Sequence, residues 1–235
     1  MAMASGHILK SFDQDLAELR ALVAQMGGVA EEAIDGAVTA LANRDADAAA
    51  RIVEGDKLLD QMETELERQV VRLIALRSPL ADDLREVLAA LKIAGVIERI
   101  GDYAKNIAKR VPLLEESRSI EPISVLPAMA RATSEMVHAA LDAFAARDAQ
   151  AALKVCQSDR VVDDFYNSLF RALLTYMMEN PHTITAAAHL LFVAKNLERI
   201  GDHATNIAEM VHFAATGEPV AERGRGADHL SPVAA

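Results

Sequence analysis

The stretch that decides the fold occurs twice, as Val96-Ile-Glu-Arg-Ile-Gly-Asp-Tyr-Ala-Lys-Asn-Ile-Ala108 and as Asn196-Leu-Glu-Arg-Ile-Gly-Asp-His-Ala-Thr-Asn-Ile-Ala208. The two copies are identical at nine of their 13 positions. Apolar residues recur every three or four positions in both, which is the period of a helix that packs one face against its neighbours. The chain is therefore predicted to be a duplicated unit with the same helix in each half.

The duplication extends beyond this helix. Residues 44–49 return as 147–152, and residues 56–60 return as 159–163. Asp45 and Asp148 stand where a side-chain acceptor would cap the second helix of each half. Ser78-Pro79 and Asn180-Pro181 are expected to open the third helix, because proline suits a first helical turn. Each half is therefore predicted to hold three helices.

The composition is typical of a helical protein. Of the 235 residues, 51% are hydrophobic, only 4% are aromatic, and none is tryptophan. A core of Ala, Val, Leu, Ile and Met suits close packing between helices. We predict an all-α fold of two tandem three-helix bundles related by internal duplication. The bundles are expected over residues 8–115 and 122–217, followed by a disordered tail over 218–235, where the composition changes.

The charge and the hydropathy exclude several classes of protein. A formal net charge of −11 argues against binding to nucleic acid or to an anionic membrane, since both need a basic face. Apolar runs fall short of the roughly 18 residues of a membrane span, and the N-terminus lacks a signal-peptide pattern. The single cysteine, Cys156, fits a reducing compartment. We therefore expect a cytoplasmic protein.

Acidic residues are paired four positions apart in each half, which stacks their carboxylates on one helix face. If the second and third helices of a half lie antiparallel with these faces together, four carboxylates converge and need a counter-ion. Such oxygen ligands suit hard cations such as Mg²⁺, Mn²⁺, Ca²⁺ or iron. The candidate ligands are Asp56, Asp60, Glu98 and Asp102 in the first half, and Asp159, Asp163, Glu198 and Asp202 in the second.

Two further pairs of residues accompany these ligands. Asn106 and Asn206 lie one turn beyond the last carboxylate on the same face, and Arg99 and Arg199 lie beside it. Both pairs are candidates for supporting contacts to the ligands. A single acidic pair on a helix is usually only a solvated face. Here four pairs occupy matching positions in two copies, which favours a cation site.

An enzymatic function has less support from the sequence than a cation site. The sequence shows no glycine-rich phosphate loop, no Gly-x-Ser-x-Gly, no His-Glu-x-x-His and no Cys-x-x-Cys. The acidic pairs keep open a metal-dependent all-α nucleotide pyrophosphohydrolase, although no group that would bind its substrate is evident. A ferritin-like oxidase, which needs buried metals with histidine support in a Glu-x-x-His pattern, ranks last.

The duplicated Glu-Arg-Ile-Gly-Asp motif, the Ser78-Pro-Leu-Ala-Asp-Asp-Leu-Arg85 segment and the Asp-x-x-x-Asp pairs together closely resemble the PhoU family of bacterial phosphate-transport regulators. The resemblance covers about Phe12 to Gly217. It implies two tandem three-helix bundles whose acidic motifs bind iron, manganese, magnesium or zinc, carried over to the eight carboxylates named above. Gln150 stands where the first half has Asp47, and His203 stands where it has Tyr103, so the two sites need not be equal.

The same resemblance implies the function. It indicates a non-enzymatic regulator that links a phosphate ABC transporter, through its ATPase subunit, to a sensor histidine kinase. Such a protein would restrain phosphate uptake and repress the phosphate-starvation response when phosphate is plentiful. It would be a homodimer, would bind no nucleic acid, and would reach the membrane only through its partners.

Overall fold

The computed structural model of the chain describes residues 2–114 and 121–220, without the side chains of residues 2–11 and 121–122. Most of the predicted tail, 221–235, and most of the predicted link between the halves, 115–120, lie outside the described residues. Within the described ranges the structure contains helices and turns but no strand. The predicted all-α fold is confirmed, and the boundaries 8–115 and 122–217 stay predictions.

Each half contributes three long helices. In the first half these are α1 (Ala2–Asn43), α2 (Ala46–Arg77) and α3 (Asp82–Ala108), followed by the short α4 (Val111–Leu114). In the second half, a 3₁₀ turn over Glu121–Val125 leads into α5 (Leu126–Ala146), α6 (Ala149–Glu179) and α7 (Ile184–Thr216). A second 3₁₀ turn over Pro181–Thr183 separates α6 from α7.

The helix ends follow the capping chemistry of the sequence. The Asp45 carboxylate accepts a hydrogen bond from the Ala48 N–H at 2.8 Å, and the Asp148 carboxylate accepts bonds at the start of α6. Both predicted N-caps are therefore confirmed. The prediction for Ser78 was wrong by a few residues, since its N–H bonds to the Ile74 carbonyl and its φ of 49° ends α2. Asp82 begins α3 instead.

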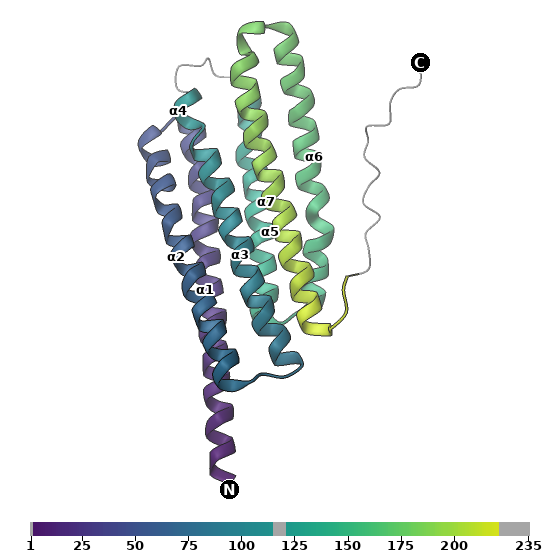
Figure 1. Cartoon of the computed structure of the whole chain (residues 1–235). Helices are drawn as coiled ribbons and strands as arrows, with labels where there is room; N and C mark the ends of the chain where they lie inside the picture. The colour runs from purple at the N-terminus through teal and green to yellow at the C-terminus, as the bar shows by residue number, and fades with distance from the viewer. Residues whose placement is uncertain (1, 115–120, 221–235) are drawn as a thin grey trace.

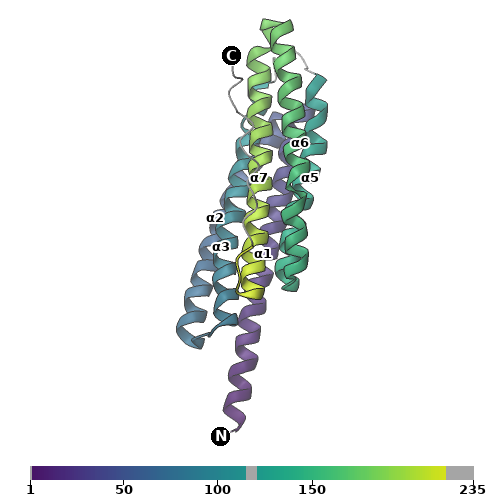
Figure 2. The same cartoon turned by 90° about the vertical axis from the view of Figure 1, so that its right-hand side faces the viewer.

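The six long helices pack as two bundles that share a central layer. In each half the three long helices contact one another, and the halves meet where α1 packs on α5 and α3 packs on α7. Figure 1 shows α2 and α6 on opposite sides of the molecule, and Figure 2 shows the same helices running along a common long axis. The two copies of the duplicated motif, in α3 and α7, therefore lie side by side at the centre.

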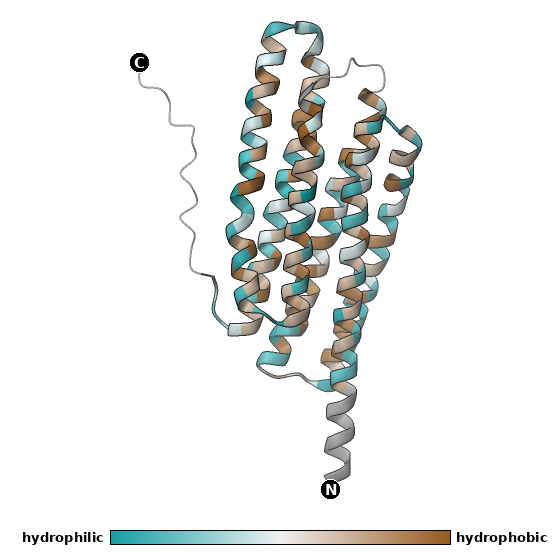
Figure 3. Ribbon diagram, turned by 180° about the vertical axis from the view of Figure 1, so that it is seen from behind, coloured by the Kyte–Doolittle hydropathy of each residue, from teal (hydrophilic) through white to brown (hydrophobic). Residues whose placement is uncertain are grey.

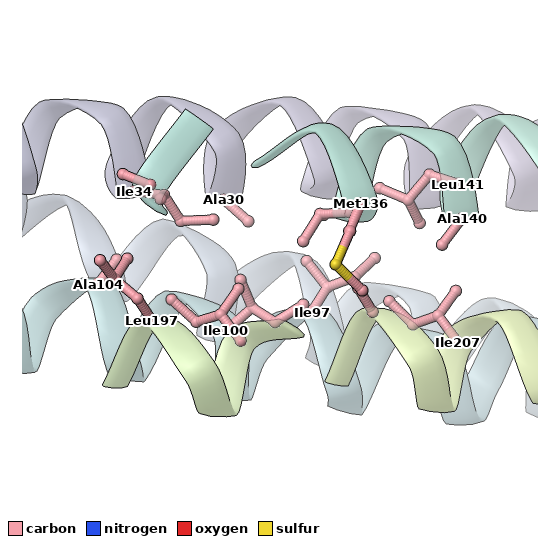
Figure 4. Close-up of a cluster of buried hydrophobic side chains, with 14 of the residues drawn as sticks. Ala30, Ile34, Ile97, Ile100, Ala104, Met136, Ala140, Leu141, Leu197 and Ile207 are labelled. Atoms are coloured by element: carbon pink, nitrogen blue, oxygen red, sulfur yellow. The ribbon is translucent and has the colours of Figure 1, made fainter. Parts of the chain in front are cut away.

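One continuous hydrophobic core joins the two halves. It includes Ile97 and Ile100 of α3, Leu197 of α7 and Met136 of α5, all almost fully buried (Figure 4). Many of the other core positions are alanine, whose small side chain lets helices approach closely. Figure 3 shows hydrophilic and hydrophobic residues on each long helix. The helical period of the motif thus places its apolar residues inside and leaves its charged residues at the rim.

A buried carboxylate also ties the halves together. Glu86 of α3 is only 2% exposed, and its Oε1 accepts a hydrogen bond of 2.5 Å from Arg20 Nε of α1. Its Oε2 lies 3.1 Å from Nε of Arg147, which belongs to the turn between α5 and α6. Because a charge without a partner is costly inside a protein, these two arginines hold Glu86 in place and connect the first half to the second.

Candidate functional site

The acidic faces of the neighbouring helices meet in both halves. Gly101 of α3 faces α2, and Gly201 of α7 faces α6. A Cβ atom at Gly101 would lie 3.7 Å from Oδ1 of Asp56 in α2, and one at Gly201 would lie 3.7 Å from Oδ1 of Asp159 in α6. Leu59 of α2 and Val162 of α6 lie nearer to these two positions than the aspartates do. The missing side chain at Gly101 therefore makes room for Leu59, and each aspartate lies beside the glycine of the neighbouring motif helix.

Lys105 joins two of the predicted ligands in the first half. Its Nζ donates to Asp56 Oδ2 at 2.5 Å and to Asp102 Oδ1 at 2.6 Å. Burial alone would lower the pKa of Lys105, but the hydrogen bonds to Asp102 and Asp56 raise it above its usual value. Lys105 is therefore a permanent ammonium ion between α2 and α3.

The remaining carboxylates of the first half also lie close together. Burial raises the pKa of Glu98, and the charges of Asp102, Glu63 and Asp60 raise it further. Burial likewise raises the pKa of Glu63, with added effects from nearby acidic groups, while Arg99 opposes both shifts. We call Asp56, Asp60, Glu63, Glu98 and Asp102 the first acidic cluster. Its members repel one another when ionised.

The second half assembles a matching group. Burial raises the pKa of Asp163, and the charge of Glu198 adds to the effect. Burial also raises the pKa of Asp202, where the charge of Asp163 works in the same direction against Lys195. Lys195 Nζ donates to Glu198 Oε1 at 2.6 Å. We call Asp159, Asp163, Glu198 and Asp202 the second acidic cluster.

The two clusters differ in where their lysine lies. Lys105 is replaced by Thr205 in the second copy of the motif, and Lys195 is replaced by Gly95 in the first. Lys195 also lies 5.3 Å from the ring centroid of Tyr166 on α6. Each half thus places one ammonium ion in its acidic face, but a few turns apart along the motif helix.

An aromatic pair separates the clusters at the contact between α3 and α7. The rings of Tyr103 and His203 stack with centroids 5.4 Å apart. Burial lowers the pKa of His203, and the charges of Arg99 and Arg199 lower it further. A hydrogen bond with Tyr103 raises the pKa of Arg199. The equivalent residues of the two copies therefore contact each other, with the arginines beside them.

The predicted supporting residues lie at the rim. Arg99, Arg199 and Asn206 are exposed, and Asn106 is half-buried. Arg99 lowers the pKa of Glu98 through its charge, and Arg199 lowers that of Asp202. Their role beside a bound ion stays a prediction. The role of the two asparagines stays a prediction.

The fit of these residues to a metal ion is partial. The donor set is rich in oxygen, which suits hard cations. However, the oxygens of Asp56 and Asp102 face an ammonium ion, and within residues 2–114 and 121–220 no three acidic, histidine or cysteine side chains are arranged to hold a metal. The eight carboxylates thus stay predicted ligands that would have to rearrange around an ion.

The sequence analysis did not identify the lysines of the two acidic clusters. Lys105 and Lys195 each stand three residues from an acidic partner, a spacing that predicts contact on a helix and was available in the sequence.

A Glu-x-x-His pattern also occurs in α7 at Glu209 and His212. His212 Nδ1 lies 3.1 Å from the Glu218 carbonyl oxygen, at the helix end, so this pair does not extend the second acidic cluster.

The fold and the site together define a class of protein: a duplicated helical bundle in which each half carries an acidic cluster between its second and third long helices. The PhoU domain model matches residues 23–111 and 126–211, one match in each half. The chain belongs to the PhoU family, as the motif resemblance predicted.

Relatives and solved structures agree with this assignment. A phosphate-specific transport system accessory protein PhoU homolog from Zymomonas mobilis is 58% identical over 96% of this chain and 95% of the relative. The phosphate-specific transport system accessory protein PhoU from Escherichia coli is 39% identical over 97% of this chain and 94% of the relative. The crystal structure of PhoU from Pseudomonas aeruginosa superimposes with a TM-score of 0.84 at 39% identity, covering 88% of this chain and 100% of that one.

Proposed function

We propose that this protein is an accessory regulator of phosphate-specific transport, which restrains phosphate uptake and keeps the phosphate-starvation response repressed when phosphate is plentiful. The observation that carries the proposal is the 58% identity, over nearly the whole chain, to a phosphate-specific transport system accessory protein. The Streptococcus pneumoniae relative of known structure is described as a phosphate transport system regulatory protein, and it matches with a TM-score of 0.83 at 30% identity, covering 90% of this chain and 100% of that one.

The protein acts through binding and not through turnover. PhoU is a non-enzymatic family, and membership in it confirms the prediction that this chain is not an enzyme. The pyrophosphohydrolase and oxidase alternatives therefore lose their support. The acidic residues are then free to serve as a recognition surface and as ligands for a cation.

The partners are the ATPase subunit of the phosphate ABC transporter and the sensor histidine kinase of the starvation response. What supports them is the family relationship, together with a formal net charge of −11 for the chain, which suits binding to basic protein surfaces better than binding to nucleic acid. The protein works in the cytoplasm as a homodimer and meets the membrane through these partners. Among the helices that the structure describes, none is long and apolar enough to cross a bilayer.

Divalent metal is the proposed ligand of the acidic clusters. The support is the convergence of carboxylates from α2 and α3, and from α6 and α7, whose mutual repulsion a cation would relieve. A bound iron, manganese, magnesium or zinc ion would supply positive charge to this surface.

Binding of purified partners tests the proposal directly. We expect saturable binding of the chain to the phosphate transporter ATPase subunit and to the cytoplasmic part of the sensor kinase, measured by biolayer interferometry. The ATPase subunit of an unrelated ABC transporter from the same organism is the control. Failure to bind either partner, combined with steady hydrolysis of nucleoside triphosphates in Mg²⁺ buffer, would contradict the proposal.

A further inference from the structure

The outer face of α6 carries a row of large apolar side chains that are left exposed. Phe170, Leu174 and Met178 follow one another at four-residue spacing, so their side chains form one ridge along the helix. They are 39%, 41% and 85% exposed. We call these three residues the apolar ridge. It lies at one side of the molecule, because α6 is an outer helix of the second half (Figure 1).

Contacts with a neighbouring side chain fix where the apolar ridge begins. The Phe170 ring packs on the Tyr166 ring with centroids 6.2 Å apart, and Lys195 of α7 lies over the same Tyr166 ring. The apolar ridge therefore runs along the side of α6 that is next to α7. Ile184, in the first turn of α7, is 48% exposed and adds apolar surface at the same end of the molecule.

The first half shows that the fold does not require this ridge. The shift of 103 residues that relates α6 to α2 places Glu67, Val71 and Ala75 at the matching positions, which are also exposed. The buried positions next to them stay alike, since Leu66 and Leu169 are both almost fully buried. The second half thus exposes large apolar side chains where the first half has a charge and two small side chains. Such a contiguous exposed patch indicates an interaction site.

A second row of exposed side chains on α6 indicates which partner fits. Arg171, Thr175 and Glu179 each follow a residue of the apolar ridge. Arg171 and Glu179 stand eight residues apart, about 12 Å along the helix, and are too far apart to pair with each other. If a second α6 lies antiparallel across the apolar ridge, its Glu179 end meets the Arg171 end of the first. A two-fold axis forms this opposite-charge contact twice.

The apolar ridge also matches itself in shape. Ridges of four-residue spacing on two helices interdigitate at a crossing angle of about −50°. With the two-fold axis at Leu174, Phe170 of one chain lies against Met178 of the partner subunit. Two helices that cross in this way bury less than the roughly 800 Å² per partner of a standard interface. We therefore expect a dissociation constant on the order of 10 µM.

We propose that the apolar ridge of α6 is the contact face of the homodimer, in which the α6 helices of two chains cross antiparallel about a two-fold axis at Leu174. The inference rests on the proposed homodimer and adds its face and its register. Arg171 of each chain pairs with Glu179 of the partner subunit. The matching face of α2, which lacks the apolar ridge, stays outside the contact.

Substitution of Leu174 tests the face. Leu174→Glu places two carboxylates at the two-fold axis and should keep the full chain monomeric up to about 100 µM in sedimentation equilibrium. Val71→Glu is the matched control, because it puts the same charge at the equivalent, 68% exposed position of α2, and it should dimerise as the wild type does. Met178→Glu serves if Leu174→Glu folds poorly. Circular dichroism confirms the fold of each variant.

Charge reversal tests the register. Arg171→Glu and Glu179→Arg should each weaken dimerisation about tenfold, because each brings like charges together at both ends of the contact. The double variant restores opposite charges in the reverse order and should dimerise within about threefold of the wild type. A role for either residue only within its own chain predicts no such recovery. Failure of the double variant to recover would contradict the antiparallel register.

The outcomes separate this inference from the proposals on which it depends. A dimer that Leu174→Glu weakens no more than Val71→Glu does would overturn the inference and leave the homodimer standing. A wild-type chain that stays monomeric at about 100 µM would overturn both. The regulatory function is judged separately, by binding to the transporter ATPase and the kinase.

Discussion

Replacing Arg20 and Arg147 together by alanine should destabilise the protein strongly, because it leaves the Glu86 carboxylate buried and unpaired. Glu86 is 2% exposed, whereas the two arginine side chains are 30% and 44% exposed. Removing the partners of a buried charge costs about 3–5 kcal/mol. Since solvent screens the exposed sides of the arginines, we expect about 3 kcal/mol for the double variant and about 1–2 kcal/mol for each single one.

The assay is urea unfolding followed by circular dichroism at 222 nm, with tyrosine fluorescence as a second probe for a two-state transition. Adding Glu86→Leu to the double variant should recover much of the loss, since the unpaired charge is then gone. The singly substituted Glu86→Leu protein completes the cycle and reports the coupling energy. The reasoning is refuted if the double variant loses less than about 1 kcal/mol, or if Glu86→Leu makes it still less stable.

Three further predictions concern the motif helices. Gly201→Ala should stabilise the protein by about 0.5–1 kcal/mol in urea unfolding. Gly101→Ala should stabilise it less or destabilise it, because the new Cβ would lie 2.3 Å from Leu59 Cδ1. Equal gains in stability from the two variants would show that Leu59 moves freely. Burial and nearby acidic groups raise the pKa of Glu98, so Glu98→Gln should raise the free energy of unfolding by about a few tenths of a kcal/mol at pH 7 without metal. This gain in stability should vanish as the pH falls through the pKa of Glu98, because the wild-type carboxyl then becomes neutral. A gain that persists at pH 4 counts against charge repulsion. Burial and nearby arginines lower the pKa of His203, so below about pH 6.5 the unfolded chain binds more protons than the native one and wild-type stability falls. His203→Phe should therefore make the urea midpoint less dependent on pH between pH 7 and pH 5. A midpoint that changes with pH as steeply as in the wild type would contradict this.

The duplication and its helices could be predicted from the sequence because they depend on local patterns. Asp45 and Asp148 cap the helices that follow them, and the four-residue spacing of Glu98 and Asp102 places them on one face, as expected for short-range rules. The wrong prediction for Ser78 also has a local cause. Ser78 precedes a proline, which disfavours helical backbone at the residue before it, so Ser78 ends α2 instead of opening α3.

The charges that complete the site could not be predicted in the same way. Lys105 is visibly three residues from Asp102, but its second partner, Asp56, is 49 residues away and is reached only because α2 packs against α3 at Gly101. Glu86 meets Arg147 across the contact between the halves, which no periodicity reveals. Such contacts depend on how the helices are rotated about their axes, and that is set by the packing of the whole core.

The central claim, that this chain is a repressing regulator of the phosphate response, is tested most directly in a strain of the source organism that lacks its gene and carries a reporter for a phosphate-starvation promoter. In phosphate-rich medium the account predicts high reporter activity without the chain and low activity when the wild-type chain is restored from a plasmid. A reporter that stays repressed in the deletion strain under these conditions would contradict it.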